Sequence, residues 1–328
     1  MVDKELLVKT AKKIVSREDV KYVVGYKQGT YGFVISPSFA YTPEDVDNFI
    51  YNPLCKKNLT VYPILEEKLP LRREEEEDKR KIGIVVKGCD SRALVQIIQE
   101  KGLTREDLVI IGIPCKGVID LKKIEKRFPN QTEAVNVVET DNAEYILNIS
   151  GAVQHIPKEE LLSEVCKSCE YPNPTIYDFL IGEKIEVGEV PEYSGLKNLD
   201  ETPLEDRWAY WEKHFQNCIR CYACREACPL CYCKTCMADM LEPQWIRRSV
   251  NLSENTAWNI MRAFHLAGRC ISCGECESVC PVNIPLMELN KKLEKDVKEM
   301  FKYNAGLDTK EKTLFGTFNP DDPEEFIM

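Results

Sequence analysis

Apolar and polar residues alternate through residues 1–190 in the way that is typical of an α/β domain. Residues 4–15 carry apolar side chains at helical spacing between lysines, which predicts an amphipathic helix. Short β-branched runs at residues 20–25 and 33–35 predict strands. A charged block at residues 72–81 predicts a solvated loop or an exposed helix turn. The clearest pattern follows it: strand 82–87, helix 91–100, strand 108–114 and helix 117–128.

The two strands of that series bring two cysteines together. Strands joined by a helical crossover lie parallel, so their carboxyl ends meet at one edge of the sheet, where α/β folds hold their sites. Cys89 and Cys115 follow these strands, and Asp90 or Ser91 is placed to cap the helix between them. We therefore expect both thiols at the same sheet edge.

The pattern becomes helical further along the chain. Strand-like runs at 134–138, 145–149 and 177–181 surround Cys166 and Cys169. Residues rich in glycine, proline and charge at 188–203 predict a linker, and helices are expected at 204–216, at 254–267 behind a Ser253 cap, and at 285–303. The predicted organisation is an α/β domain with a mixed or parallel sheet at 1–190, a linker at 191–203, a mostly α-helical domain at 204–303, and a C-terminal tail at 304–328 that drapes on a neighbour or stays mobile.

Length and charge exclude several classes of protein. A chain of 328 residues is longer than one hydrophobic core usually supports, which favours two domains. Its longest apolar runs fall far short of the roughly 18 residues that span a bilayer. The N-terminus carries charges where a secretory signal needs an apolar core, so we expect a cytoplasmic protein without a transmembrane segment. The net charge of -10 offers no basic face to nucleic acid.

Sixteen cysteines change this picture, because dense cysteine in a reducing compartment indicates metal or redox chemistry. The runs CIRCYACREACP and CISCGECESVCP have the C-x2-C-x2-C-x3-C-P spacing of two-cluster bacterial ferredoxins. Three cysteines of each run wrap one [4Fe-4S] cluster, and the fourth ligates the other cluster. The first predicted set is therefore Cys218, Cys221, Cys224 and Cys280, and the second is Cys270, Cys273, Cys276 and Cys228.

Zinc is the alternative metal, because C-x2-C pairs also form zinc sites. Zinc takes two pairs per metal, however, whereas this chain has two complete tetrads, each followed by proline. The 41 residues between Cys228 and Cys270 exceed the gap of a compact ferredoxin and contain the predicted helix 254–267. The C-terminal part is thus expected to resemble the α-helical ferredoxin domains of respiratory and disulfide-reducing complexes.

The other cysteines leave several interpretations open. Four N-terminal thiols are candidates for a third cluster, although the two at the sheet edge could equally be small buried hydrophobes. These four are Cys89, Cys115, Cys166 and Cys169. The three thiols of PLCYCKTC could hold a fourth metal together with Cys55, could shield or tune the nearby cluster, or could form an ordinary loop. These three are Cys231, Cys233 and Cys236.

Four motifs carry a family resemblance: YNPLCKKNLTVY, KGCDSRALVQI, IGIPCKG and CKSCEYPNPTIYDFLIGEK. Through them residues 20–186 resemble the beta-subunit family of deazaflavin-coenzyme hydrogenases and formate dehydrogenases, whose members bind iron–sulfur clusters and usually FAD. The resemblance implies a third cluster on Cys89, Cys115, Cys166 and Cys169. Many relatives place the ferredoxin module before this domain, whereas here it follows. The sequence has neither a G-x-G-x-x-G after a strand nor a P-loop, so FAD is implied by the resemblance alone.

Together these features predict an iron–sulfur electron-transfer subunit that relays single electrons. The expected partners are catalytic and electron-transfer subunits of a hydrogenase, formate dehydrogenase or heterodisulfide-reductase-like complex, and soluble ferredoxin. One rival hypothesis is an FAD-containing oxidoreductase subunit that exchanges hydride with a deazaflavin coenzyme or NAD(P)H and splits it into single electrons. Another is a zinc-bound scaffold without redox chemistry.

Overall fold

A five-stranded mixed sheet organises the N-terminal part of the chain. The computed structural model describes residues 3–68, 78–133, 135, 137–139, 143–149, 151–317 and 320. The strand order is β2-β1-β3-β4-β8, with β1 and β2 antiparallel and the other neighbours parallel. The strands are β1 (Val20–Gln28), β2 (Ile35–Ala40), β3 (Lys81–Val86), β4 (Leu108–Gly112) and β8 (Phe179–Leu180). The predicted α/β class with a mixed sheet is confirmed.

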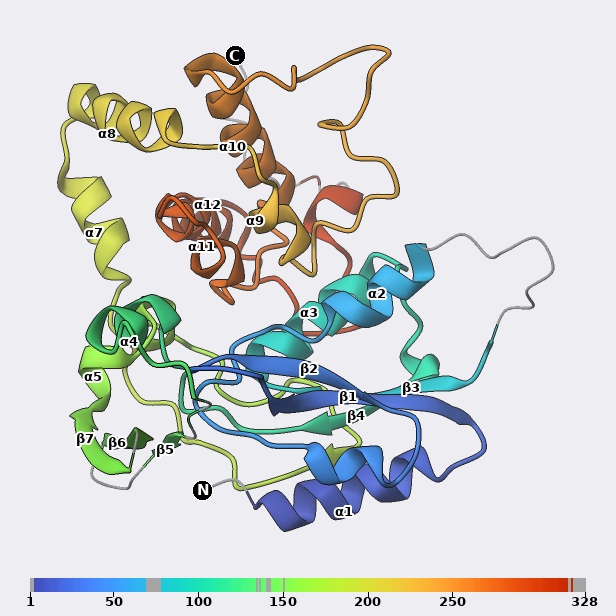
Figure 1. Ribbon diagram of the computed structural model, residues 1–328. Helices are drawn as coiled ribbons and strands as arrows, with labels where there is room; N and C mark the ends of the chain where they lie inside the picture. Colours follow the sequence, from blue (N-terminus) through green and yellow to red (C-terminus); the bar gives the residue numbers. More distant parts are fainter. Residues whose placement is uncertain are drawn as a thin grey trace.

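Helices cover both faces of this sheet (Figure 1). Helix α1 (Lys4–Val15) lies on one face, and α2 (Val61–Lys68) and α3 (Gly88–Gln99) lie on the other. Helix α1 has its predicted bounds because the Asp3 carboxylate accepts the Leu6 N–H at 3.0 Å. Three short helices follow the later strands: α4 (Leu121–Arg127), α5 (Lys158–Leu161) and α6 (Glu164–Lys167).

Helix α3 begins earlier than the sequence predicted, and this places Cys89 in its first turn. Its N-cap is Lys87, not Asp90 or Ser91. Asp90 lies inside the first turn and accepts the Lys87 backbone N–H at 3.0 Å. The helix predicted at 117–128 spans only α4, because Gly117 has a left-handed φ of 105° and Asp120 caps the first turn.

A second, antiparallel sheet of three strands stands apart from the first. It consists of β5 (Val137–Glu139), β6 (Glu144–Ile149) and β7 (Ala152–Pro157), in that order. The sequence pattern missed β7, because its side chains are exposed except for Ile156, so the strand lacks an apolar alternation.

The C-terminal part is helical, as predicted. Its helices are α7 (Ser194–Glu201), α8 (Leu204–Gln216), α9 (Ala223–Glu226), α10 (Leu252–Leu266), α11 (Glu275–Ser278) and α12 (Leu286–Phe301), and short 3-10 turns lie at Asp45–Asn48, Arg105–Asp107 and Leu314–Gly316. Helix α7 occupies the predicted linker, and its Leu196 and Leu199 join the core of the helical part. The cap of α10 is Asn251 instead of Ser253, because the Asn251 side chain accepts the Glu254 N–H at 3.0 Å.

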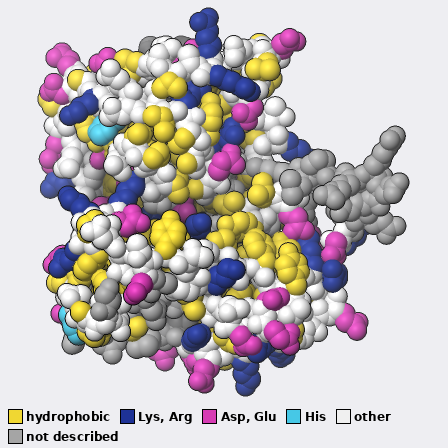
Figure 2. Space-filling model, in the orientation of Figure 1, with side chains coloured by type: hydrophobic (Ala, Val, Ile, Leu, Met, Phe, Trp, Pro, Cys, Tyr) yellow, Lys and Arg dark blue, Asp and Glu magenta, His cyan; other side chains and the backbone are white. Residues whose placement is uncertain are grey.

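The helical part packs on the face of the sheet that carries α3 (Figure 1). The Arg92 guanidinium, on α3, donates to the Ala305 carbonyl at 2.7 and 3.1 Å. Residues at the start of the predicted tail are therefore fixed on α3, and Ala305 is buried. Figure 2 shows hydrophobic side chains gathered where the two parts meet.

Parts of the charged block and of the C-terminal tail are not described by the structure. Residues 72–77 of the charged block, and 318, 319 and 321–328 of the tail, lie outside the described residues. The division at 191–203 stays a prediction. Among the described residues, no helix has both the length and the apolarity to cross a membrane.

Candidate metal centres

The two ferredoxin-type runs fold into loops of the same backbone shape. Arg220 and Tyr222 have left-handed φ angles of 55° and 59°, and Ser272 and Gly274 repeat them at 53° and 75°. Left-handed residues that alternate with right-handed ones turn successive N–H groups toward one side, which favours an anionic group there. Each loop leads into a one-turn helix, α9 after Tyr222 and α11 after Gly274.

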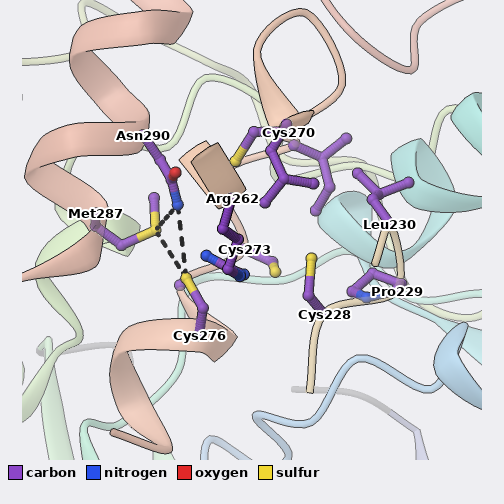
Figure 3. Close-up of a pocket in the computed structure, with 12 residues that line it drawn as sticks. Cys228, Pro229, Leu230, Arg262, Cys270, Cys273, Cys276, Met287 and Asn290 are labelled. Atoms are coloured by element: carbon purple, nitrogen blue, oxygen red, sulfur yellow. Dashed lines mark hydrogen bonds between the residues drawn. The ribbon is translucent and has the colours of Figure 1, made fainter. Parts of the chain in front are cut away.

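The structure gathers the eight ferredoxin-type cysteines into the two predicted sets. One small cavity is lined by Cys218, Cys221, Cys224 and Cys280. A second is lined by Cys228, Cys270, Cys273 and Cys276 (Figure 3). Each set combines three cysteines of one run with the last cysteine of the other run. In the described part of the chain, no three Cys, His, Asp or Glu side chains converge closely enough to hold a single metal ion.

The surroundings of the second set suit thiolates that bind a cation. Burial raises the pKa of Cys270 to about 11 and also raises the pKa of Cys276. A buried thiol of this kind ionises readily only when a metal replaces its proton. The Asn290 amide lies 3.6 Å from the Cys276 sulfur, where it can donate a hydrogen bond (Figure 3). The donor chemistry of this cavity therefore fits an iron–sulfur cluster.

The four N-terminal thiols line one cavity of about 350 Å³. They are Cys89, Cys115, Cys166 and Cys169. Cys89 follows β3 and Cys115 follows the parallel β4, so these two lie at one sheet edge, as expected. The Cys115 N–H donates to the Pro172 carbonyl at 2.9 Å, which ties this edge to the segment after Cys169. Burial raises the pKa of Cys166 to about 12. A buried thiol with a raised pKa ionises readily when a metal replaces its proton, so this set also fits an iron–sulfur cluster.

Gly88 permits the close approach that shapes this third cavity. A Cβ at Gly88 would lie 2.1 Å from the Tyr171 carbonyl oxygen, so any side chain would push the start of α3 away from the segment that follows Cys169. Sequence reasoning did not single out Gly88. A glycine directly after a buried strand and before a helix was the signal that could have found it.

A buried ion pair stands beside Cys89. The Lys87 ammonium lies 2.9 Å from the Asp90 carboxylate, and the two side chains are 1% and 0% exposed. The ammonium also donates to the Lys57 carbonyl at 3.0 Å and to the Tyr26 hydroxyl. Lys87 faces the third cavity together with three other lysines, Lys56, Lys116 and Lys158. The cavity wall is therefore rich in cations.

The cysteines of PLCYCKTC lie elsewhere. Cys231, Cys233 and Cys236 line a separate cavity of about 240 Å³ with Arg262 and His265. Cys55 is fully buried and accepts the Asn52 N–H at 3.3 Å, and it does not line that cavity. The suggested set of these three thiols with Cys55 therefore does not form. Cys231 instead hydrogen-bonds to Cys228, which lowers the pKa of Cys228.

Comparisons with known proteins match both parts of the chain. Residues 217–285 match the family model of the 4Fe-4S dicluster domain. The F420-dependent formate dehydrogenase subunit beta of Methanocaldococcus jannaschii is 25% identical over 292 residues, covering 72% of this chain and 76% of that protein. The F420-dependent formate dehydrogenase 1 subunit beta of Methanococcus maripaludis is 21% identical, with the same coverage.

Among solved structures, a chain of the F420-reducing [NiFe] hydrogenase complex from Methanosarcina barkeri matches with a TM-score of 0.33 and 14% identity, and the match covers 52% of this chain and 64% of that one. The match to the two curated relatives and the dicluster domain confirms the resemblance that the four motifs suggested. The chain is therefore similar, over 72% of its length, to beta subunits of F420-dependent formate dehydrogenases, and it carries a match to the 4Fe-4S dicluster domain.

Proposed function

We propose that the chain is an iron–sulfur electron-transfer subunit of a multi-subunit redox complex, and that each of its three cysteine sets holds one [4Fe-4S] cluster. The observation that carries the proposal is the sorting of twelve cysteines into three cavities, each lined by one complete set of four. Bound there, the clusters would supply one-electron oxidation and reduction.

The spatial order of the cavities supports a relay. Cys273 lines both the second and the third cavity. Arg262 lines the second cavity and donates to the carbonyl of Cys224, which belongs to the first set. The second set thus lies between the other two. Electron transfer along this series of clusters requires no general acid or base.

The partners that fit this role are other subunits of a redox complex. The two curated relatives are named as beta subunits of F420-dependent formate dehydrogenases. By analogy we propose that this chain assembles with a catalytic subunit of the formate dehydrogenase, hydrogenase or heterodisulfide-reductase type and with further electron-transfer subunits. Soluble ferredoxin is a further proposed partner.

Iron content tests the number of clusters. Anaerobically purified protein should contain about twelve irons per chain, in three clusters of four. The double variant Cys89→Ser, Cys166→Ser should retain about eight. Cys233→Ser, at an exposed thiol outside the three sets, is the matched control and should retain all of them. A wild type with about eight irons, unchanged in the double variant, would show that the third set holds no cluster. Zinc with little iron would support the scaffold hypothesis instead.

A flavin oxidoreductase is the second candidate, favoured by the residues that line the third cavity. The cavity extends beyond its thiols to Lys116, Lys158 and the apolar Val187 and Val190. Lysines suit the phosphates of a dinucleotide, and apolar walls suit an aromatic ring. Release of about one FAD per chain on acid extraction would support this candidate. Fully iron-loaded protein without FAD would leave a pure relay.

A further inference from the structure

Arg262 is a buried arginine placed between the first and second cysteine sets. It lies on α10, the helix within the long interval that separates the two cysteine runs. Its side chain is buried and lines the second cavity, where Figure 3 shows the guanidinium among Cys228, Cys273 and Cys276. One of its terminal nitrogens donates to the Cys224 carbonyl at 2.9 Å. Arg262 therefore contacts one set through the backbone and faces the thiols of the other.

The positive charge of Arg262 has little compensation from the protein. Its Nε atom is buried without a hydrogen-bond partner. Among the described residues, no carboxylate forms an ion pair with it, whereas Arg225 pairs with Asp239 and Arg269 pairs with Glu100. A buried charge without a partner is strongly destabilising. The electrostatic neighbours of Arg262 are the thiols of Cys276, Cys231, Cys228 and Cys224. Negative charge at the second set is thus the partner that the geometry leaves for Arg262.

We propose that Arg262 is a positioning residue that raises the reduction potential of the cluster held by the second set. The inference rests on the proposed function, since it requires a cluster on these four cysteines. Reduction adds one electron and no proton to a cluster, so the reduced form carries one more negative charge. A fixed cation at the cavity wall stabilises that form more than the oxidised one, and the effect is strong where water is excluded.

A redox titration of the iron-loaded full chain, followed by EPR, tests this role. Arg262→Gln keeps a polar side chain without the charge, and it should lower the midpoint potential of one cluster while the iron content stays at the wild-type level. Arg262→Lys keeps the charge and should restore most of the shift. Arg127→Gln removes the same charge from the exposed Arg127 on α4 and should leave every potential unchanged. Wild-type potentials in Arg262→Gln with full iron would overturn the proposal.

A second measurement covers the case in which Arg262→Gln does not retain the second cluster. Wild-type protein carrying arginine labelled with heavy nitrogen in the guanidinium group should show a weak nitrogen hyperfine coupling at the reduced cluster, and the coupling should become weaker in labelled Arg262→Lys. A wild type without such a coupling refutes the placement of Arg262. Failure of the proposed function can be distinguished from failure of the role of Arg262. In the first case the wild type itself would lack the iron of the second set.

Discussion

Glu100 joins the two parts of the molecule, and its replacement should loosen their interface. Glu100 caps the C-terminal end of α3, and its two carboxylate oxygens each lie 2.6 Å from a nitrogen of Arg269, in the helical part. The Tyr232 hydroxyl donates to the same carboxylate. The side chains of Glu100 and Arg269 are 13% and 21% exposed, so the pair is only partly screened by solvent. Burial alone would raise the pKa of Glu100, but the hydrogen bonds and charge of Arg269 outweigh it and hold that pKa below its usual value.

Glu100→Gln removes the charge and one of the two acceptors of this pair. A hydrogen bond to a charged group contributes about 1.5–3 kcal/mol, and loss of one partner from a fully buried pair costs about 3–5 kcal/mol. For this partly exposed pair we expect the interface to open about 2 kcal/mol more easily, which corresponds to about thirtyfold faster exchange of the amides that it protects. Hydrogen–deuterium exchange of the iron-loaded protein, read at residues 228–236 and 266–273, measures this.

The control and the pH dependence sharpen the test. Glu106→Gln makes the same chemical change at an exposed carboxylate and should leave exchange unchanged. Because the pKa of Glu100 is lowered on folding, the pair stabilises above the unfolded value of 4.5 and is lost only as the pH falls through the lower folded value. The difference between variant and wild type should therefore be constant from about pH 6 to 8. Exchange within about twofold of the wild type would refute the estimate for the pair.

Three further substitutions test the packing around two cysteine sets and at the contact between residue 306 and α3. Gly88→Ala places a Cβ 2.1 Å from the Tyr171 carbonyl and should remove the iron that the third set holds. Its control is Gly188→Ala, in the wall of the same cavity, where no atom lies within 4 Å of the added carbon. Equal iron contents in the two variants would contradict the argument. Asn255→Leu removes a buried amide that donates to the Phe215 and Cys218 carbonyls at 3.0 and 2.8 Å, which should cost about 2–4 kcal/mol and weaken the first set, seen as a lower melting temperature and earlier loss of cluster absorbance. Gly306→Ala strains a residue with φ of 74° whose Cβ would lie 2.3 Å from the Arg92 carbonyl, so exchange at residues 304–308 should rise while the iron content stays full; unchanged exchange would show that this segment is not fixed by Gly306.

Local signals were sufficient where the chemistry is encoded in short spacings. The ferredoxin-type runs predicted the two cysteine sets because three thiols of each set share one loop and the repeated spacing assigns the fourth to the other run. The apolar pattern of the parallel strands β3 and β4 likewise predicted that Cys89 and Cys115 lie at one sheet edge. Helix α8 has its predicted bounds, since Trp211 and Phe215 mark its buried face.

The sequence pattern did not predict the features that depend on tertiary contacts. Helix α7 lies in a segment whose composition predicts a linker. Its Leu196 and Leu199 belong to a buried cluster that also contains Trp211 and Met287, so the helix depends on tertiary packing that the local pattern does not reveal. The separation of Cys55 from the other unassigned thiols also depends on the arrangement of the two parts. Arg262 had no sequence signal, since one arginine in an amphipathic helix ordinarily faces solvent.

The position of Cys273 bears on how such proteins are assembled from modules in evolution. This residue belongs to the wall between two neighbouring cavities, one in each part of the chain. The wall forms because the loop before α11 faces the start of α3. This contact does not require either module to come first in the chain. Chains that carry the two modules in opposite orders can therefore place their cysteine sets in the same spatial order. The connecting segment only has to be long enough for these two surfaces to meet.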